Sequence, residues 1–310
     1  MRSVRSLRLG SAVALSAGVA LFGAAALPAA HATSYVGVYA SYGNIAVDPD
    51  DSTVTAGEFN FGDTDLPGGT FVTEFSGDSI DPIDNAVETR DNSEEWLAAD
   101  TPIGEVFGAS GPSADTQFLR VGVTADVTGT TVFTFDEPIP ADRFAIAIGD
   151  LDLDTVVVTA TDADGNTVSR GGLYGSSTDN AFNLCAVATQ PDVCSGETAV
   201  PVVTDTSGSI TFAPDADGTD SGVTGWLAPN TDIASITITH TNAETPASTV
   251  RFWLAGLATA TESSPSATPS AAELATTGSA MNANTLWGAT ALSVLGIAGM
   301  AFVAIRRARA

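Results

Sequence analysis

The chain has 310 residues and a formal net charge of −26, because 37 acidic residues stand against 11 basic ones. All the basic residues are arginine, and only five of them lie between Asp48 and Glu273, the region that holds every acidic residue. That region therefore carries a formal charge of about −32. A surface this acidic repels nucleic acid and anionic polymers, which excludes nucleic-acid binding as a function.

Residues 1–32 have the three parts of an export signal. Three arginines precede an alanine-rich apolar segment, and the small-x-small sequence Ala30-His31-Ala32 follows it. We expect cleavage after Ala32, so that the mature chain begins at Thr33. The residues between this signal and the C-terminal segment are then expected to face the outside of the cell.

From Thr33 to about Ala260 the sequence has a β pattern throughout. Short runs of β-branched and aromatic residues alternate with period 2 and are separated by turn sequences, as is typical of half-buried strands. The runs are 34–40, 58–61, 70–75, 117–123, 130–135, 143–148, 155–159, 209–212, 233–239 and 250–254. Many short strands with spaced turns predict an all-β protein, an antiparallel β-sandwich of the jelly-roll type.

Two interpretations are open for residues 33–129. They either belong to the same sandwich as the more regular residues 130–257, or form a separate N-terminal domain with a boundary near residue 129. We expect the acidic, turn-rich stretch 78–100 to be a long loop, and we expect no amphipathic helix after the export signal.

Cys185 and Cys194 are the only cysteines, and they lie nine residues apart in a chain predicted to be exported. This context predicts a disulfide between them, with two free structural thiols as the alternative. A C-x8-C spacing does not correspond to a known metal site.

Three acidic clusters are candidates for binding cations. The first consists of alternate residues, which share one face if the segment is extended: Asp150, Asp152 and Asp154. Two D-x-D-G sequences resemble the opening of calcium loops, although neither has the glutamate of an EF-hand. Strand-like flanks favour a plain hairpin turn for the one at 162–166. Calcium is the one cofactor that the sequence suggests, at Asp215, Asp217 and Asp220.

His240 is the lone histidine of the predicted mature chain. It lies on the same strand face as Ile236 and Ile238, so we expect it at the edge of the core. A single histidine leaves little room for a Ser-His-Asp triad or a zinc protease site, and no G-x-S-x-G sequence is present. Glycoside hydrolysis needs only two carboxylates, but 37 acidic residues make any chosen pair uninformative.

Trp253 and Trp226, together with Trp96, are candidates for stacking a sugar ligand. Trp253 lies on the strand face opposite Phe252 and Leu254. It therefore either stacks a ligand or is covered by a loop or a second sheet.

The C-terminal region changes composition. Residues 261–273 are rich in serine, threonine and proline, which predicts a flexible, extended stalk. The pentapeptide Leu274-Ala275-Thr276-Thr277-Gly278 follows, and residues 286–305 then form an uncharged apolar run. These 20 residues suit a helix that crosses a bilayer. We expect the arginine-rich tail, 306–310, to stay on the cytoplasmic side.

This order of pentapeptide, apolar span and basic tail resembles a sortase cell-wall sorting signal. The pentapeptide is similar to the L-A-x-T-G form associated with class E sortases of high-GC Gram-positive bacteria. The resemblance implies that a sortase cuts between Thr277 and Gly278 and joins Thr277 to an amine of a peptidoglycan precursor. The span would then be a temporary anchor. The alternative is a permanent single-pass membrane protein.

The stretch from Phe133 to Thr167 also resembles jelly-roll domains of other anchored bacterial surface proteins, without catalytic motifs. We therefore expect a wall-anchored surface protein without enzymatic activity that acts as a binding or coat module. A carbohydrate-binding or calcium-dependent adhesion module, with a glycan or cell-surface ligand, is the second hypothesis. A hydrolase on a sandwich fold is the third.

Overall fold

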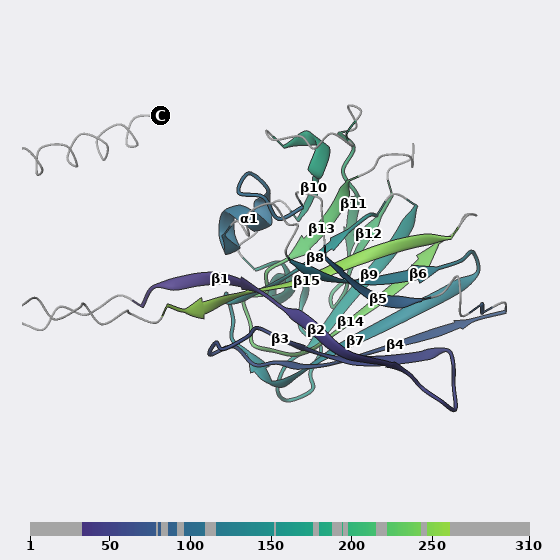
Figure 1. Cartoon of the computed structure of the whole chain (residues 1–310). Coiled ribbons are helices and arrows are strands. Elements are labelled where there is room, and N and C mark those ends of the chain that lie inside the picture. Colours follow the sequence, from purple (N-terminus) through teal and green to yellow (C-terminus); the bar gives the residue numbers. More distant parts are fainter. Residues whose placement is uncertain are drawn as a thin grey trace, which may run out of the picture. The chain divides into compact units, whose positions relative to one another are not determined.

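The computed structural model describes residues 33–78, 80–81, 86–91, 96–108, 116–151, 153–175, 180–187, 194, 198–214, 222–242 and 247–260. The chain divides into two units, 1–260 and 261–310, and every described residue belongs to the first. That unit consists mainly of antiparallel strands in two sheets (Figure 1). The prediction of an all-β antiparallel sandwich is confirmed.

The first sheet, as far as the structure describes it, has seven strands with β15 at its centre. In spatial order they are β10 (Ala181–Asn183), β13 (Val223–Leu227), β8 (Phe144–Gly149), β15 (Ser248–Thr259), β6 (Gln117–Val123) and β5 (Val87–Asp91), while β1 (Tyr35–Tyr39) also pairs with β15. β6 pairs with residues 248–252 of β15 and β1 pairs with residues 255–259. Two short strands therefore share one side of β15.

The second sheet has eight strands within the described part of the chain. In spatial order they are β11 (Val202–Asp205), β12 (Ile210–Ala213), β9 (Asp154–Thr161), β14 (Ile233–Asn242), β7 (Val127–Ile139), β4 (Gly69–Gly77), β3 (Val54–Asn60) and β2 (Ser41–Val47). The chain passes from β1 into β2 at Ala40 and so changes sheets there. Residues 33–129 thus add strands to both sheets, and residue 129 lies inside β7.

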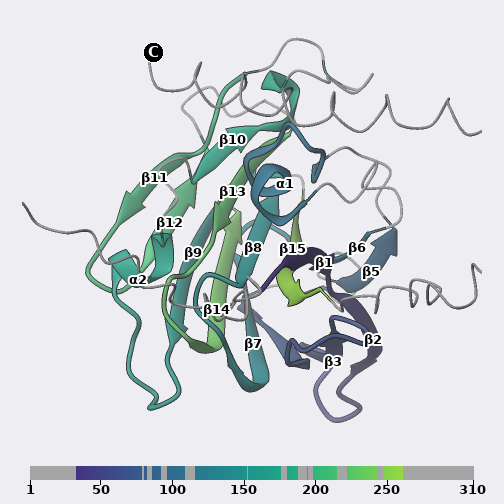
Figure 2. The ribbon, with the colours of Figure 1, turned by 90° about the vertical axis from the view of Figure 1, so that its left-hand side faces the viewer.

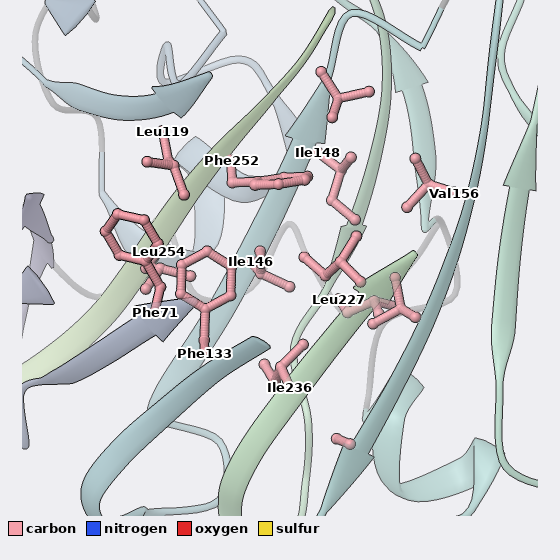
Figure 3. Close-up of a cluster of buried hydrophobic side chains, with 14 of the residues drawn as sticks. Phe71, Leu119, Phe133, Ile146, Ile148, Val156, Leu227, Ile236, Phe252 and Leu254 are labelled. Atoms are coloured by element: carbon pink, nitrogen blue, oxygen red, sulfur yellow. The ribbon is translucent and has the colours of Figure 1, made fainter. Parts of the chain in front are cut away.

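A hydrophobic cluster fills the space between the two sheets (Figure 3). Alternate residues of each strand point into it because successive side chains of a strand point to opposite faces. Phe133 of β7 makes an edge contact with Phe252 of β15, with 6.1 Å between ring centroids. It also contacts Phe71 of the neighbouring strand β4 at 6.1 Å. The first of these aromatic pairs joins the two sheets across the core, and the second lies within the eight-stranded sheet.

A second hydrophobic cluster lies on the outer face of the seven-stranded sheet. A short helix, α1 (Pro102–Phe107), contributes to it and begins after Thr101, whose Oγ1 accepts a hydrogen bond from the backbone N–H of Gly104. Ile103 and Phe107 of this helix belong to the same cluster as Trp253 of β15. The helix and its flanking residues therefore form a partial third layer (Figure 2).

The structure corrects several element predictions. The stretch 78–100, predicted to be a loop, contains β5. α1, α2 (Arg170–Tyr174) and a 3₁₀-helix (Leu184–Ala186) are too short to show a helical period in the sequence. β13 was not predicted because all five of its residues are buried, so it does not alternate.

None of the helices in the described residues is long and apolar enough to span a bilayer. The predicted export signal, stalk, pentapeptide, apolar span and basic tail lie outside the described residues.

The contact between the outer cluster and β8 can be tested at Gly149. A Cβ atom there would lie 2.5 Å from Cζ3 of Trp96 and 2.8 Å from Cζ3 of Trp253. We expect Gly149→Ala to lower the free energy of unfolding by about 1–3 kcal/mol, measured by urea denaturation. Gly171→Ala is the control, because a Cβ at this helical position meets nothing within 4 Å. It should be neutral or stabilise by about 0.5–1 kcal/mol. Equal effects of the two substitutions would contradict tight packing of this cluster.

Candidate functional site

A group of polar side chains is buried at the end of the sandwich where β15 begins. Asp154 begins β9, His240 lies near the end of β14, and Ser248 begins β15. Asp154 and His240 are each only 1% exposed. In Figure 1 this end is opposite the end where β15 finishes and β1 starts. The first and last described residues of the chain, Thr33 and Ala260, lie at that opposite end of the sandwich.

The carboxylate of Asp154 is at the centre of this polar cluster. Its Oδ1 lies 2.6 Å from Nε2 of His240 and also accepts a hydrogen bond from Oγ of Ser248. Because a carboxylate oxygen accepts, Nε2 carries the hydrogen. Asp154 and His240 belong to the eight-stranded sheet and Ser248 to the seven-stranded sheet. One carboxylate therefore ties the two sheets together.

The cluster contains the residue types of a hydrolytic triad in a different order. In a triad the imidazole lies between the serine and the carboxylate, so that it can take the proton of the serine. Here the carboxylate lies between Ser248 and His240. Nδ1 of His240 is buried and has no hydrogen-bond partner among the described residues. This arrangement holds the three groups in place but does not activate the serine through the imidazole.

A small hollow of about 190 Å³ adjoins the buried cluster. Asp150 and Asp154 are among the residues that line it, together with Ser248 and Thr249. Oδ2 of Asp150 lies 3.0 Å from Nη2 of Arg251. Asp150 and Asp154 both line the hollow, and each contacts another protein group.

The segment from Asp150 to Asp154 is not extended, so the condition under which these residues would share one face is not met. Asp150 has a φ of 66°, in the left-handed region, so the chain turns sharply after β8. It contacts Arg251, whereas Asp154 turns toward His240. The third member of that predicted cluster, Asp152, lies outside the described residues.

Arg251 connects Asp150, which lines the hollow, to the outer cluster. Its guanidinium lies 5.4 Å from the ring centroid of Trp96 and 5.5 Å from that of Phe118. Cation–π attraction of this kind fixes a charged group over an apolar surface. The Asp150–Arg251 ion pair is thereby positioned by the same layer that covers Trp253.

The sequence-predicted calcium residues, Asp215, Asp217 and Asp220, lie outside the described residues. In the part of the chain that the structure describes, no three His, Cys, Asp or Glu side chains are grouped so as to hold a metal ion. The stretch 162–166 forms the predicted hairpin turn, since the N–H of Asp162 donates to the carbonyl of Asn166 at 3.0 Å. Hydrogen bonds from Asn166 hold the pKa of the Asp162 carboxyl below its usual value.

The rings of Trp226 and Trp253 are buried. They are therefore not available to stack a ligand, contrary to that prediction. Their exposed fractions are 4% and 0%. Trp96 stacks on Trp253 with 5.4 Å between ring centroids and 29° between ring planes. Of the two interpretations of Trp253, coverage by a loop is the one that the structure supports.

The predicted disulfide between Cys185 and Cys194 is present, with its Cα atoms 5.4 Å apart. Oδ1 of Asn183 accepts a hydrogen bond from the backbone N–H of Cys185 at 2.8 Å and caps the 3₁₀-helix. Leu184 of this helix packs in the outer cluster. The disulfide therefore ties residue 194 to the layer that covers the seven-stranded sheet.

The sequence placed His240 correctly on the core-facing side of its strand but did not predict its partners. Asp154 lies 86 residues before it, and Ser248 lies 94 residues after Asp154. Strand alternation could have shown that Asp154 shares a face with Val156 and Val158. The contact with Ser248 depends on how the two sheets stack, which the alternation does not encode.

Comparisons with known proteins assign no family. No family model and no curated protein matches the chain. One similar solved structure is the crystal structure of the enzymatically active domain of bacteriophage CBA120 tailspike protein 4, at 10% identity and a TM-score of 0.30. The match covers 60% of this chain and 19% of that one. The chain thus spans about a fifth of that structure, and a likeness at this level carries no argument.

The role of Asp154 can be tested by removing its side chain. Asp154→Ala would leave Nε2 of His240 and Oγ of Ser248 without their partner in a buried place. We expect the free energy of unfolding in urea to fall by about 2–5 kcal/mol. Asp164→Ala, at an exposed turn position, is the control and should change it by no more than about 0.5 kcal/mol. If the two variants lose the same amount, the carboxylate does not tie the sheets.

Proposed function

We propose that the chain is a cell-wall-anchored surface protein whose β-sandwich acts as a non-enzymatic binding or coat module. The observation that carries this proposal is the position of the two ends of the body. The N–H of Ala260 donates a hydrogen bond to the carbonyl of Ser34 at 2.9 Å. After signal cleavage at Ala32, the new N-terminus and a stalk from residue 261 would both join the body at this one end.

The resemblance to a sorting signal indicates attachment to the cell wall. It rests on the pentapeptide Leu274, Ala275, Thr276, Thr277 and Gly278. A class E-like sortase would cut after Thr277 and join it to a peptidoglycan precursor. The protein would then be held at the membrane only until this transfer. A wall-linked domain on a stalk has to resist pulling forces that enter through residue 261.

β15 is well placed to receive such a force, because it has paired strands on both sides. Asp65 holds its last residue: Oδ1 accepts a hydrogen bond from the N–H of Thr259 at 2.8 Å, and Oδ2 accepts one from its hydroxyl at 2.6 Å. Arg143 adds an ion pair of 2.8 Å. The hydroxyl of Thr259, together with Arg143, holds the pKa of the Asp65 carboxyl well below its usual range. Hydrogen bonds on both flanks of a strand that is pulled along its axis would share the load.

The order of eight strands favours the jelly-roll form of the sandwich. β6, β15, β8 and β13 are neighbours in one sheet, and β7, β14, β9 and β12 are neighbours in the other. Along the chain these eight strands pass repeatedly between the sheets, as expected for a jelly roll. Because one fold hosts many functions, this form supports the resemblance to surface domains without naming a ligand.

A carbohydrate-binding or adhesion function is the second candidate, and the hollow at the start of β15 favours it. Carboxylate and hydroxyl groups of Asp150, Ser248 and Thr249 line this hollow, which is the polar chemistry that sugar hydroxyls require. A hydrolase is less well supported, because Asp150 and Asp154 are both engaged with protein partners and Ser248 donates to the carboxylate of Asp154.

Anchoring can be tested with a matched pair of substitutions in the pentapeptide. Thr277→Ala removes the residue whose carbonyl the sortase would attack, so the protein should move to the membrane fraction or the medium. Thr276→Ala changes the variable position and should remain wall-bound. Fractionation after boiling detergent and wall-digesting enzymes separates these outcomes. If the Thr277→Ala protein still resists detergent and is released only by wall digestion, the sorting signal is not used.

Calcium binding can be separated from general screening by melting the protein released from the wall. Sodium chloride should raise the melting temperature, because the screening length falls from ~10 Å at 0.1 M to ~3 Å at 1 M. At matched ionic strength, we expect millimolar calcium to add a rise that Asp217→Ala abolishes. Asp164→Ala, in the other D-x-D-G sequence, should leave this rise intact. Equal shifts with calcium and magnesium in all three proteins would rule out a specific calcium site.

A further inference from the structure

The outer edge of β1 has backbone groups that pair with no other described strand. Ala40 donates to the carbonyl of Leu254, and Ala260 donates to the carbonyl of Ser34, so the even-numbered residues of this segment bond to β15. In an antiparallel pair, the residues between them direct their N–H and C=O groups to the other side. Within the described part of the chain, β1 pairs with β15 alone. The backbone groups of Tyr35, Gly37 and Tyr39 therefore face outward.

A hollow of about 490 Å³ runs along this edge. Residues 36–41 line it together with Phe61 and Gly62, which follow β3, and Gly108, which follows α1. The hydroxyl of Tyr39 donates to the carbonyl of Gly108 at 3.0 Å and fixes one wall. A strand of five residues spans about 17 Å, and the volume lies in the range of about 300–1,000 Å³ typical of binding sites.

The residues that line the hollow indicate what kind of ligand it would bind. None of the described residues that line it is charged, and Val36 is 51% exposed on its surface. Exposed acidic residues lie close in the sequence to two lining residues, Asp63 next to Gly62 and Glu105 three residues before Gly108. An uncharged strip on a strongly acidic body fits an extended segment with small or apolar residues at its centre and basic residues at its ends.

A second copy of the chain does not fit this edge. The edge is recessed between walls, and an identical recessed edge could not approach it closely enough for hydrogen bonds. Two bodies with this excess of acid would also repel each other. A free extended segment with basic residues is narrow enough to enter between the walls, and the acidic charge does not repel it.

We propose that the recessed edge of β1 binds an extended, basic segment of a partner protein, which adds as a further strand beside β1. In strand addition the backbone hydrogen bonds supply affinity, and the pockets for alternate side chains supply selectivity. This inference goes beyond the proposed wall anchoring and does not depend on it, because the edge exists whether or not the chain is attached to the wall.

The probe is a synthetic peptide with five alternating threonine and valine residues and two lysines at each end. We expect the full chain in detergent micelles to bind it saturably. The same peptide with N-methyl groups on the five central residues keeps its charge and side chains but cannot pair with a strand. We expect its binding to be at least tenfold weaker. Equal binding of the two peptides would mean charge attraction alone and would overturn the proposal.

Two substitutions test the place of binding. Val36→Lys puts a positive charge in the hollow, whereas Val47→Lys puts the same charge at an exposed position of β2. Both side chains are more than half exposed, so the fold should tolerate either change. We expect Val36→Lys to weaken peptide binding about tenfold and Val47→Lys to leave it within twofold. Equal effects would place binding elsewhere and overturn the proposal.

Amide hydrogen exchange at single-residue resolution gives a test without substitutions. In the free protein, the amides of Gly37 and Tyr39 should exchange at least tenfold faster than those of Val36 and Val38, which face β15. The peptide should slow the first pair and leave the second pair unchanged. If Gly37 and Tyr39 are already as protected as Val38 in the free protein, the edge is covered and the proposal fails.

Discussion

The structure depends on one strand, β15, that is buried on both faces. Phe252 and Leu254 point into the cluster between the sheets, and Trp253 and Ala255 point into the outer cluster. A strand that is apolar on both sides is stable only if both sides are covered. This constraint explains why α1 and the 3₁₀-helix lie against the seven-stranded sheet, and why the tryptophans that alternate away from the main core are not exposed.

The same strand relates the two ends of the body. Its first residue, Ser248, meets Asp154 of the other sheet, and its last residue, Thr259, is held by Asp65. Between these points it pairs with β8 on one side and with β6 and β1 on the other. If a stalk follows Ala260, as we propose, a force applied there would pass directly into the most heavily bonded strand of its sheet and toward the hollow at the opposite end.

The sequence predicted what local alternation encodes. It indicated most of the long strands, the core-facing position of His240 and the disulfide between Cys185 and Cys194. It did not indicate β13, since burial on both faces removes the alternation, or α1, since six residues are too few to establish a helical period. The Asp154–His240–Ser248 cluster was also missed, because these residues meet only when the two sheets stack.

The proposed attachment to the wall is the central claim about function, and the chemical state of the C-terminus tests it most directly. Mass spectrometry of material released by wall-digesting enzymes would identify the last residue of the mature chain. We expect a C-terminal peptide that ends at Thr277 and is joined through an amide bond to a peptidoglycan peptide. A mature protein that retains residues 278–310 and carries no wall fragment would contradict the account.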